Sequence, residues 1–298
     1  MATTRVAAID RTSAVRRVLI ALLMANLAVV GAKLGIGLVS HSLAVLGDAL
    51  HSAVDAFNNV LALVIVGLAS KEPDEDHPYG HGKFETLGAL AIVGFMSITC
   101  FELIRDAFAR LAVSRPAPFL SDVQLAILVA TLAVNMLVAW YENRRGHELE
   151  SDLLLADAAH TRADVFITIG VLVGMLLARR GLWWADPVLA LLIAGFIVRI
   201  AYRIFQRAVP VLVDERAIPD TAIRSLAEDV NGVKSAYGIR SRGGGSGGGG
   251  SHLRYAEVTI AVDKNANVAA AHAIADQVED RLKRELRINE VTVHVEPC

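Results

Sequence analysis

Two stretches of eight residues, 48–55 and 157–164, carry the same pattern of side chains that can bind a metal. Both read Asp-x-x-His-x-x-x-Asp, and both lie within long apolar runs. The polar residues are Asp48, His51 and Asp55 in the first stretch, and Asp157, His160 and Asp164 in the second. On a helix, offsets of three and four residues place such side chains on one face. A carboxylate at membrane depth costs about 2.5–3.5 kcal/mol, so we expect a cation between the two helices to compensate.

The expected ligands are one imidazole and one carboxylate from each stretch: His51, Asp55, His160 and Asp164. This ligand set suits zinc and neighbouring divalent metals, and four such ligands can complete a tetrahedron. The alternative is that each side chain only satisfies a local hydrogen bond. Two copies favour the metal, because ionisable residues inside membranes are functional by default. Asp48 and Asp157, one turn before each histidine, are expected to orient the imidazoles; the alternative is that they are ligands themselves.

Two further groups of residues have ligand chemistry but weaker patterns. Asp74, His77 and His81 lie in the segment 73–83, which also contains proline and glycine. That segment is either a metal site or a solvated loop. His272 lies in a predicted helix, whereas His294 and Glu296 point to one face of a predicted strand, because side chains alternate along a strand. These three residues are either ligands or simply exposed.

Long apolar runs must position the paired motif. Hydrophobic residues make up 54% of the 298 residues, and the mean hydropathy is +0.47. Six runs are long enough to cross a bilayer, which needs about 20 residues: 15–39, 43–69, 84–110, 119–141, 153–177 and 187–205. The connection 40–42 is so short that the first two helices form a hairpin. Lysine and arginine gather at one set of loops, so we expect both termini to be cytoplasmic in a multi-pass protein of the inner (plasma) membrane.

The chain changes character near residue 210, which divides it into a membrane domain, 1–209, and a soluble domain, 210–298. The second part predicts helix 219–229, strands 233–240 and 253–262, helix 267–286 and strand 290–295, which is a small α+β domain. An even number of spans places it on the cytoplasmic side. The Gly/Ser run 243–251 has the composition of a flexible linker, either a natural loop or an engineered replacement.

Composition excludes several classes of function. A net charge of −2 gives no indication of nucleic-acid binding, and two cysteines make neither a disulfide framework nor a cysteine-based zinc site. A membrane-embedded zinc hydrolase would need an open metal position and commonly uses His-Glu-x-x-His, which this sequence lacks. A membrane-anchored metal sensor remains an alternative, but it has no use for histidine and aspartate at membrane depth. Arg162, inside the second motif, either reaches towards the cytoplasm or pairs with Glu102 or Asp157.

The combination of six spans, His-x-x-x-Asp in the second and fifth, the loop His-Pro-Tyr-Gly-His-Gly-Lys and the soluble tail resembles the cation diffusion facilitator family, the proton-coupled divalent-metal exporters. The resemblance covers nearly the whole chain. It implies a homodimer whose six-helix transmembrane bundle is followed by a ferredoxin-like α+β cytoplasmic domain. It also implies zinc export by alternating access through the paired motif, since relatives with histidine at both first positions are mostly zinc exporters. Cobalt, nickel, cadmium or iron is the alternative cargo.

The resemblance also assigns roles to residues outside the paired motif. The loop site would be Asp74, His77 and His81, and the charge pair between the two parts would be Lys83 and Asp214 near the dimer interface. The soluble-domain ligands would be His272, His294 and Glu296. Tyr237 and Thr259 occupy positions where the bacterial relatives that this chain most resembles place histidine, so we expect a single zinc site or none there, rather than a two-metal cluster.

Overall fold

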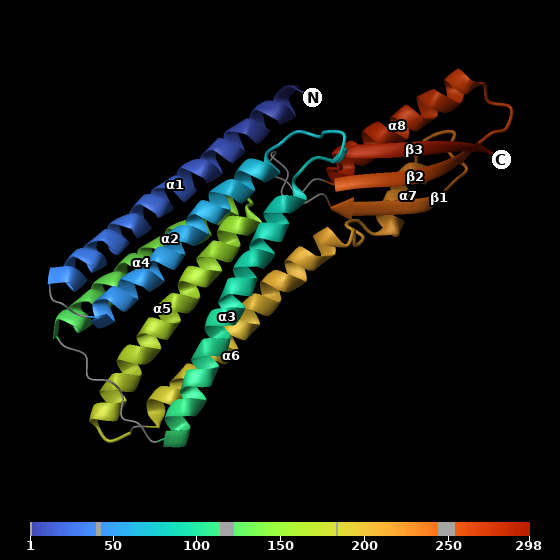
Figure 1. Ribbon diagram of the computed structural model, residues 1–298. Coiled ribbons are helices and arrows are strands. Elements are labelled where there is room, and N and C mark those ends of the chain that lie inside the picture. Colours follow the sequence, from blue (N-terminus) through green and yellow to red (C-terminus); the bar gives the residue numbers. More distant parts are fainter. Residues whose placement is uncertain (1, 40–42, 114–121, 183, 244–253) are drawn as a thin grey trace.

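The computed structural model describes residues 2–39, 43–113, 122–182, 184–243 and 254–298 (Figure 1). The predicted turn at 40–42 and all but the first residue of the Gly/Ser run lie outside this part. Six long helices come first: α1 (Ala2–Val39), α2 (Leu43–Ala69), α3 (Lys83–Val113), α4 (Asp122–Glu148), α5 (Asp152–Arg179) and α6 (Ala185–Leu212). Each described helix is long and apolar enough to cross a membrane. The predicted six-helix bundle is confirmed, including the two helices that carry the paired motif.

The bundle is built from neighbouring helix pairs. Helix α1 packs on α2, α4 on α5, and α3 on α6, while α3 and α6 both contact α5. Figure 1 shows α3 and α6 running side by side, with α6 leading directly into the soluble domain. Helix α5 therefore contacts its own partner α4 and also both helices of the α3–α6 pair. This central place is where the second copy of the motif lies.

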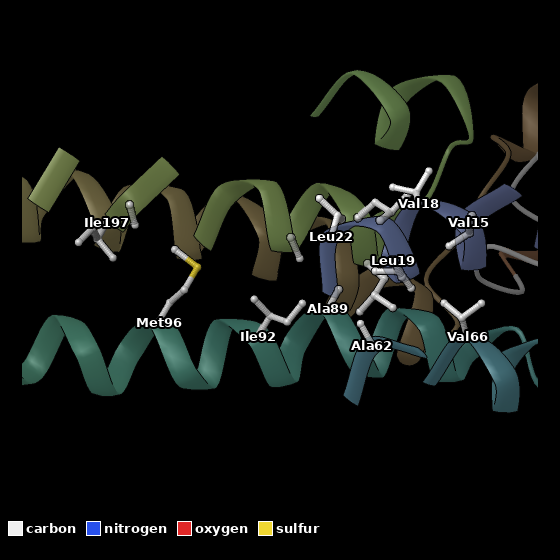
Figure 2. Packing of buried hydrophobic residues seen from close by; sticks show 14 of the residues in the cluster. Val15, Val18, Leu19, Leu22, Ala62, Val66, Ala89, Ile92, Met96 and Ile197 are labelled. Carbon is white, nitrogen blue, oxygen red and sulfur yellow. The ribbon is translucent and has the colours of Figure 1, made fainter. Parts of the chain in front are cut away.

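Small and aliphatic side chains form the bundle core. Leu19 of α1 packs against α2 and α3, where the small residues Ala62 and Ala89 let the helices approach closely (Figure 2). Further along α3, Met96 points towards the side where Ile197 of α6 lies. Many other large apolar side chains of the bundle are exposed in the isolated chain, which is expected for helices whose outer faces meet lipid.

Three membrane helices extend well beyond their predicted ends, and one of them is α4, which continues to Glu148 instead of residue 141. Helix α1 begins at Ala2 rather than near residue 15, because the preceding segment is rich in alanine and arginine, which favour helix although they are too polar to count as a span. Helix α6 continues to Leu212, past the predicted end at 205 and through Pro210. A proline this close to the end of a helix removes one backbone hydrogen bond without breaking the turns before it. The membrane helix thus reaches to within a few residues of α7.

The soluble domain contains α7 (Asp220–Glu228), β1 (Ser235–Gly243), β2 (Arg254–Val262), α8 (Val268–Leu286) and β3 (Glu290–Pro297). Its sheet order is β1-β2-β3, with β1 antiparallel and β3 parallel to β2. Helix α8 makes the crossover that a parallel pair requires. The predicted α+β domain is confirmed. Compared with the six-element ferredoxin-like order, the described chain lacks the first strand, so β3 pairs directly with β2.

Candidate metal centres

Three ligand side chains meet near the middle of helices α2 and α5. His160 Nε2 lies 3.6 Å from Asp55 Oδ1 and 3.7 Å from Asp164 Oδ2. One ligand atom from each of these three residues lies within 4.8 Å of the others, which is the spacing expected around one ion. His160 Nε2 is buried and makes no hydrogen bond with any described residue. A buried nitrogen that faces two carboxylates without a bond to either has the chemistry of a metal ligand rather than of a satisfied core histidine.

The helical repeat explains why α5 supplies two of these ligands. His160 and Asp164 are one turn apart on the same face of α5, and α2 presents Asp55 opposite them. The backbone of His51 and Asp48 lies in α2, one and two turns before Asp55. The side chains of both residues fall outside the part of the structure that is described. The arrangement therefore places three of the four expected ligands.

A small cavity adjoins the three ligands. Its volume is about 10 Å³, which is close to the room that one water molecule needs. Besides the ligands, its polar lining residues are Asn26, Asn59, Asn135, Glu142, Asp157 and Thr161. Asn59 donates to Asp157 Oδ2 over 3.1 Å and accepts a hydrogen bond from Asn26 over 2.7 Å. Thr161 donates to Glu142 Oε2 over 3.0 Å.

The described side-chain hydrogen bond of Asp157 goes to a residue other than His160. Its carboxylate accepts from Asn59 of α2, so its described hydrogen bond links the two helices rather than holding the ring of His160. Sequence reasoning missed Asn59 and Glu142, both almost fully buried. The available signal was that each is a polar residue within an apolar span, but nothing in the sequence shows which polar residue faces the motif.

Arg162 points away from the ligands. Its Nε donates to Ala158 O of the same helix over 3.1 Å, and the side chain is exposed. Among the described residues it forms no ion pair with Glu102 or Asp157, so neither of the two expected pairings is found. It lines a separate crevice beside α6.

The loop between α2 and α3 forms a second cluster. His77 Nδ1 lies 3.2 Å from Asp74 Oδ1, and His81 Nε2 lies 3.4 Å from Asp74 Oδ2. The two imidazole centroids are 4.3 Å apart. Gly80, at φ +81°, supplies the left-handed turn that brings His81 back over Asp74. His81 is only 6% exposed, and its Nδ1 has no hydrogen-bond partner among the described residues.

The backbone N–H of His77 donates to Asp74 and lowers the pKa of that carboxyl. A lowered pKa keeps the carboxylate charged to lower pH, so the Asp74 ligand is lost only in strong acid. We expect Asp74→Asn to bind one zinc ion fewer per protomer at pH 7.5, by a margin that shrinks towards pH 5.5 because protons compete with the metal for the two histidine ligands. Zinc counts on purified protein at several pH values measure this. The variant of the exposed neighbour, Asp76→Asn, should retain every ion. If it loses the same ion, the ligand set is not Asp74, His77 and His81.

The residue pair Lys83 and Asp214 joins the two domains. Lys83 Nζ lies 2.7 Å from Asp214 Oδ1, and a guanidinium nitrogen of Arg242 lies 3.6 Å from the same oxygen. Arg242 also stacks on Tyr79, with 3.8 Å between its Cζ and the ring centroid. The hydroxyl of Tyr255 donates to Tyr79 O over 3.4 Å. The loop that carries the second cluster is thus in direct contact with strands β1 and β2.

The structure does not bring the third expected group together. His272 is exposed on α8 and its nearest described acidic partner is Asp276, at 3.7 Å. His294 lies 3.5 Å from Glu296 on β3, and Tyr237 donates a hydrogen bond to Glu296. That bond raises the pKa of the Tyr237 hydroxyl. Within the described part of the chain, the groups spaced to hold a metal are the membrane and loop clusters alone.

The fold and these clusters define a multi-pass membrane protein with an α+β domain and candidate metal sites. The profile described as the cation efflux transmembrane domain matches residues 19–213, and the one for the cytoplasmic domain of cation efflux proteins matches residues 219–298. The chain therefore belongs to the cation efflux, or cation diffusion facilitator, family. It is a transporter of divalent metal cations and not an enzyme.

Three of its relatives are efflux proteins of similar length. The manganese efflux system protein MneS of Bacillus subtilis is 32% identical, covering 89% of each chain. MneP of the same organism is 28% identical, covering 97% of this chain and 98% of its own. The cation-efflux pump FieF of Shewanella oneidensis is 28% identical, over 87% and 86%. A solved CTD structure of MamM is 26% identical over 26% of this chain and 91% of its own, with a TM-score of 0.24.

Proposed function

We propose that this transporter exports zinc from the cytoplasm in exchange for protons, by alternating access. The observation that carries the proposal is the cluster of Asp55, His160 and Asp164 between two membrane helices. His51, whose side chain lies outside the described part, is the proposed fourth ligand. A four-ligand shell normally closes a zinc site. Here the ligands are divided between α2 and α5, so a change in the relative position of these helices can open the site to one side. In a family of transporters, such a movement would let the ion enter from one side of the membrane and leave on the other.

Coupling to protons follows from ligand chemistry. A metal binds the neutral form of histidine and the charged form of aspartate, so protons and metal compete for the same atoms. Histidine titrates near pH 6.5 in peptides, within the range that a proton gradient spans. A more acidic outside therefore favours release of the metal, and a less acidic cytoplasm favours reloading.

Manganese is the second candidate cargo. Imidazole ligands favour zinc, whereas carboxylate and carbonyl oxygens suit manganese. The cavity beside the ligands is rich in oxygen, with Asp157, Glu142 and Asn59 in its wall. Two of the relatives are named as manganese efflux systems. The histidine ligands support zinc as the cargo. The oxygen-rich cavity wall and the two manganese efflux relatives support manganese.

The proposal includes an orientation and an assembly. Arginine and lysine gather at the end of the bundle next to the soluble domain, which by the positive-inside rule is the cytoplasmic end. Both termini are then cytoplasmic, and residues 1–209 lie in the inner membrane while residues 210–298 lie in the cytoplasm. The match to the cytoplasmic domain of cation efflux proteins supports a homodimer held partly through that domain. The loop cluster and His294–Glu296 would then be auxiliary metal sites.

Transport into proteoliposomes tests the cargo and its coupling together. Purified protein is reconstituted, and uptake of zinc and of manganese is followed with and without an imposed pH gradient. We expect zinc uptake about tenfold faster than manganese uptake, and several-fold faster with the metal-receiving lumen acidic. If manganese were taken up faster than zinc, manganese would replace zinc as the proposed cargo, and the proposed site would stay the same. Uptake that ignores the pH gradient would contradict proton exchange.

A further inference from the structure

A crevice of about 350 Å³ lies between α5 and α6, on the side away from the ligands of α5. Its walls come mainly from α5 and α6, with the last turns of α4 and Ala89 of α3 at its edge. Such a volume is within the range of binding sites for small organic ligands. The crevice opens near the end of the bundle that adjoins the soluble domain, because Asp152 begins α5 there and Ala208 is near the end of α6.

Three arginines line the crevice against a single carboxylate. They are Arg162 of α5 and Arg203 and Arg207 of α6, and the carboxylate is that of Asp152. All three arginine side chains are exposed. Within the described part of the chain, Arg203 and Arg207 have no hydrogen-bond or ion-pair partner. Arg162 uses only its Nε, towards Ala158 O. The crevice is therefore strongly positive, which is unsuited to a route for divalent cations.

Apolar side chains continue the crevice towards the membrane centre. Phe166 of α5 and Phe196 of α6 meet edge to face, with 4.7 Å between ring centroids. Ile200 lies one turn nearer the soluble domain, beside Arg203. At about 1.5 Å of rise per residue, Arg162 lies about 6 Å and Arg203 about 10 Å from the level of the two phenylalanines, towards the soluble domain. The order from the bundle end is arginine first and aromatic ring last.

We propose that this crevice binds an anionic phospholipid. Its phosphate would contact Arg162, Arg203 and Arg207, and the first part of an acyl chain would lie along Ile200, Phe166 and Phe196. Basic pockets between membrane helices at the cytoplasmic side recognise such headgroups. Free phosphate has the same charged group as the lipid headgroup. It has no apolar part, however, that would fill the apolar end of the crevice. Because the lipid would contact both helices, it would brace α5, which carries His160 and Asp164, against α6.

Lipid binding is tested on the full-length protein in detergent, after delipidation and addition of phosphatidylglycerol or phosphatidylcholine. Native mass spectrometry counts lipids per protomer. We expect phosphatidylglycerol to be retained at least fivefold more than phosphatidylcholine. A basic residue near an anionic lipid contributes about fivefold in affinity, so Arg203→Gln with Arg207→Gln should lower retention about 25-fold. Arg199→Gln is the matched control, since Arg199 is one turn from Arg203 on α6 but does not line the crevice; its retention should change less than twofold.

Three results would overturn the proposal. Equal retention of the two lipids by the wild type would remove the headgroup preference. Equal losses in Arg199→Gln and in the double variant would make the effect one of net charge. Displacement of the bound lipid by millimolar inorganic phosphate would mean that the arginines bind a free anion. The wild-type comparison stands without any variant, so misfolding of the double variant leaves the proposal testable.

Discussion

Replacing Asp164 with alanine should abolish metal transport, lowering the rate at least about a hundredfold. Asp164 supplies one of three ligand atoms that lie within 4.8 Å of one another. Loss of residues that only support a metal ligand already costs about 10–100-fold, so loss of a ligand should cost more. The fold should persist, because alanine favours helix and removes a carboxylate that is costly at membrane depth. Uptake by proteoliposomes and an unfolding curve in detergent measure the two effects separately.

The matched control is Asp106→Ala. Asp106 lies in membrane helix α3, is exposed and pairs with the neighbouring Arg105, away from the ligand cluster. The same change of residue type in the same bundle should leave transport within about twofold of the wild-type rate. Equal loss in both variants would mean that the ligand assignment is wrong. Retained transport by Asp164→Ala would place the transported ion elsewhere.

Replacing Arg11 with methionine should destabilise the bundle by about 3–5 kcal/mol, which is the usual loss when one partner of a buried ion pair is removed. Arg11 and Glu85 are 8% and 3% exposed, and their nearest charged atoms are 3.3 Å apart. Arg11 also donates to Leu149 O over 2.7 Å, and Ser151 donates to Glu85. The network joins α1, α3 and the α4–α5 junction, so the variant leaves the Glu85 charge buried without its cation.

A double-mutant cycle separates the charge from the rest of the network. Arg11→Met with Glu85→Leu should recover most of the lost free energy of unfolding, because two apolar side chains need no partner. Arg17→Met is the control: Arg17 is exposed on α1 and donates only to Ser13 O, so its change should stay within about 0.5 kcal/mol. The free energy of unfolding comes from denaturant titration in detergent. A cycle with no coupling energy would show that Arg11 and Glu85 act independently.

Periodicity determined most of the fold from the sequence. The apolar runs are long enough that only membrane helices fit them, and the alternating pattern after residue 210 is that of strands. Local signals also set boundaries: the side chain of Asn267 caps α8 by accepting from Ala270 N over 2.8 Å, next to the predicted start. Where polarity and helix propensity disagreed, as in the first turns of α1, the prediction began the helix too late in the chain.

By itself, the sequence determined the ligand types, because spacing on one helix is fixed: His160 and Asp164 must share a face of α5. Only the tertiary structure decided which residues of other helices join them. Asp55 faces His160, Asn59 holds Asp157, and Glu142 of α4 completes the polar wall, because helix packing brings distant turns to one depth. The same packing set His272 apart from His294 and turned Arg162 from the paired motif into the α5–α6 crevice. Local periodicity chooses a face, whereas packing chooses what that face meets.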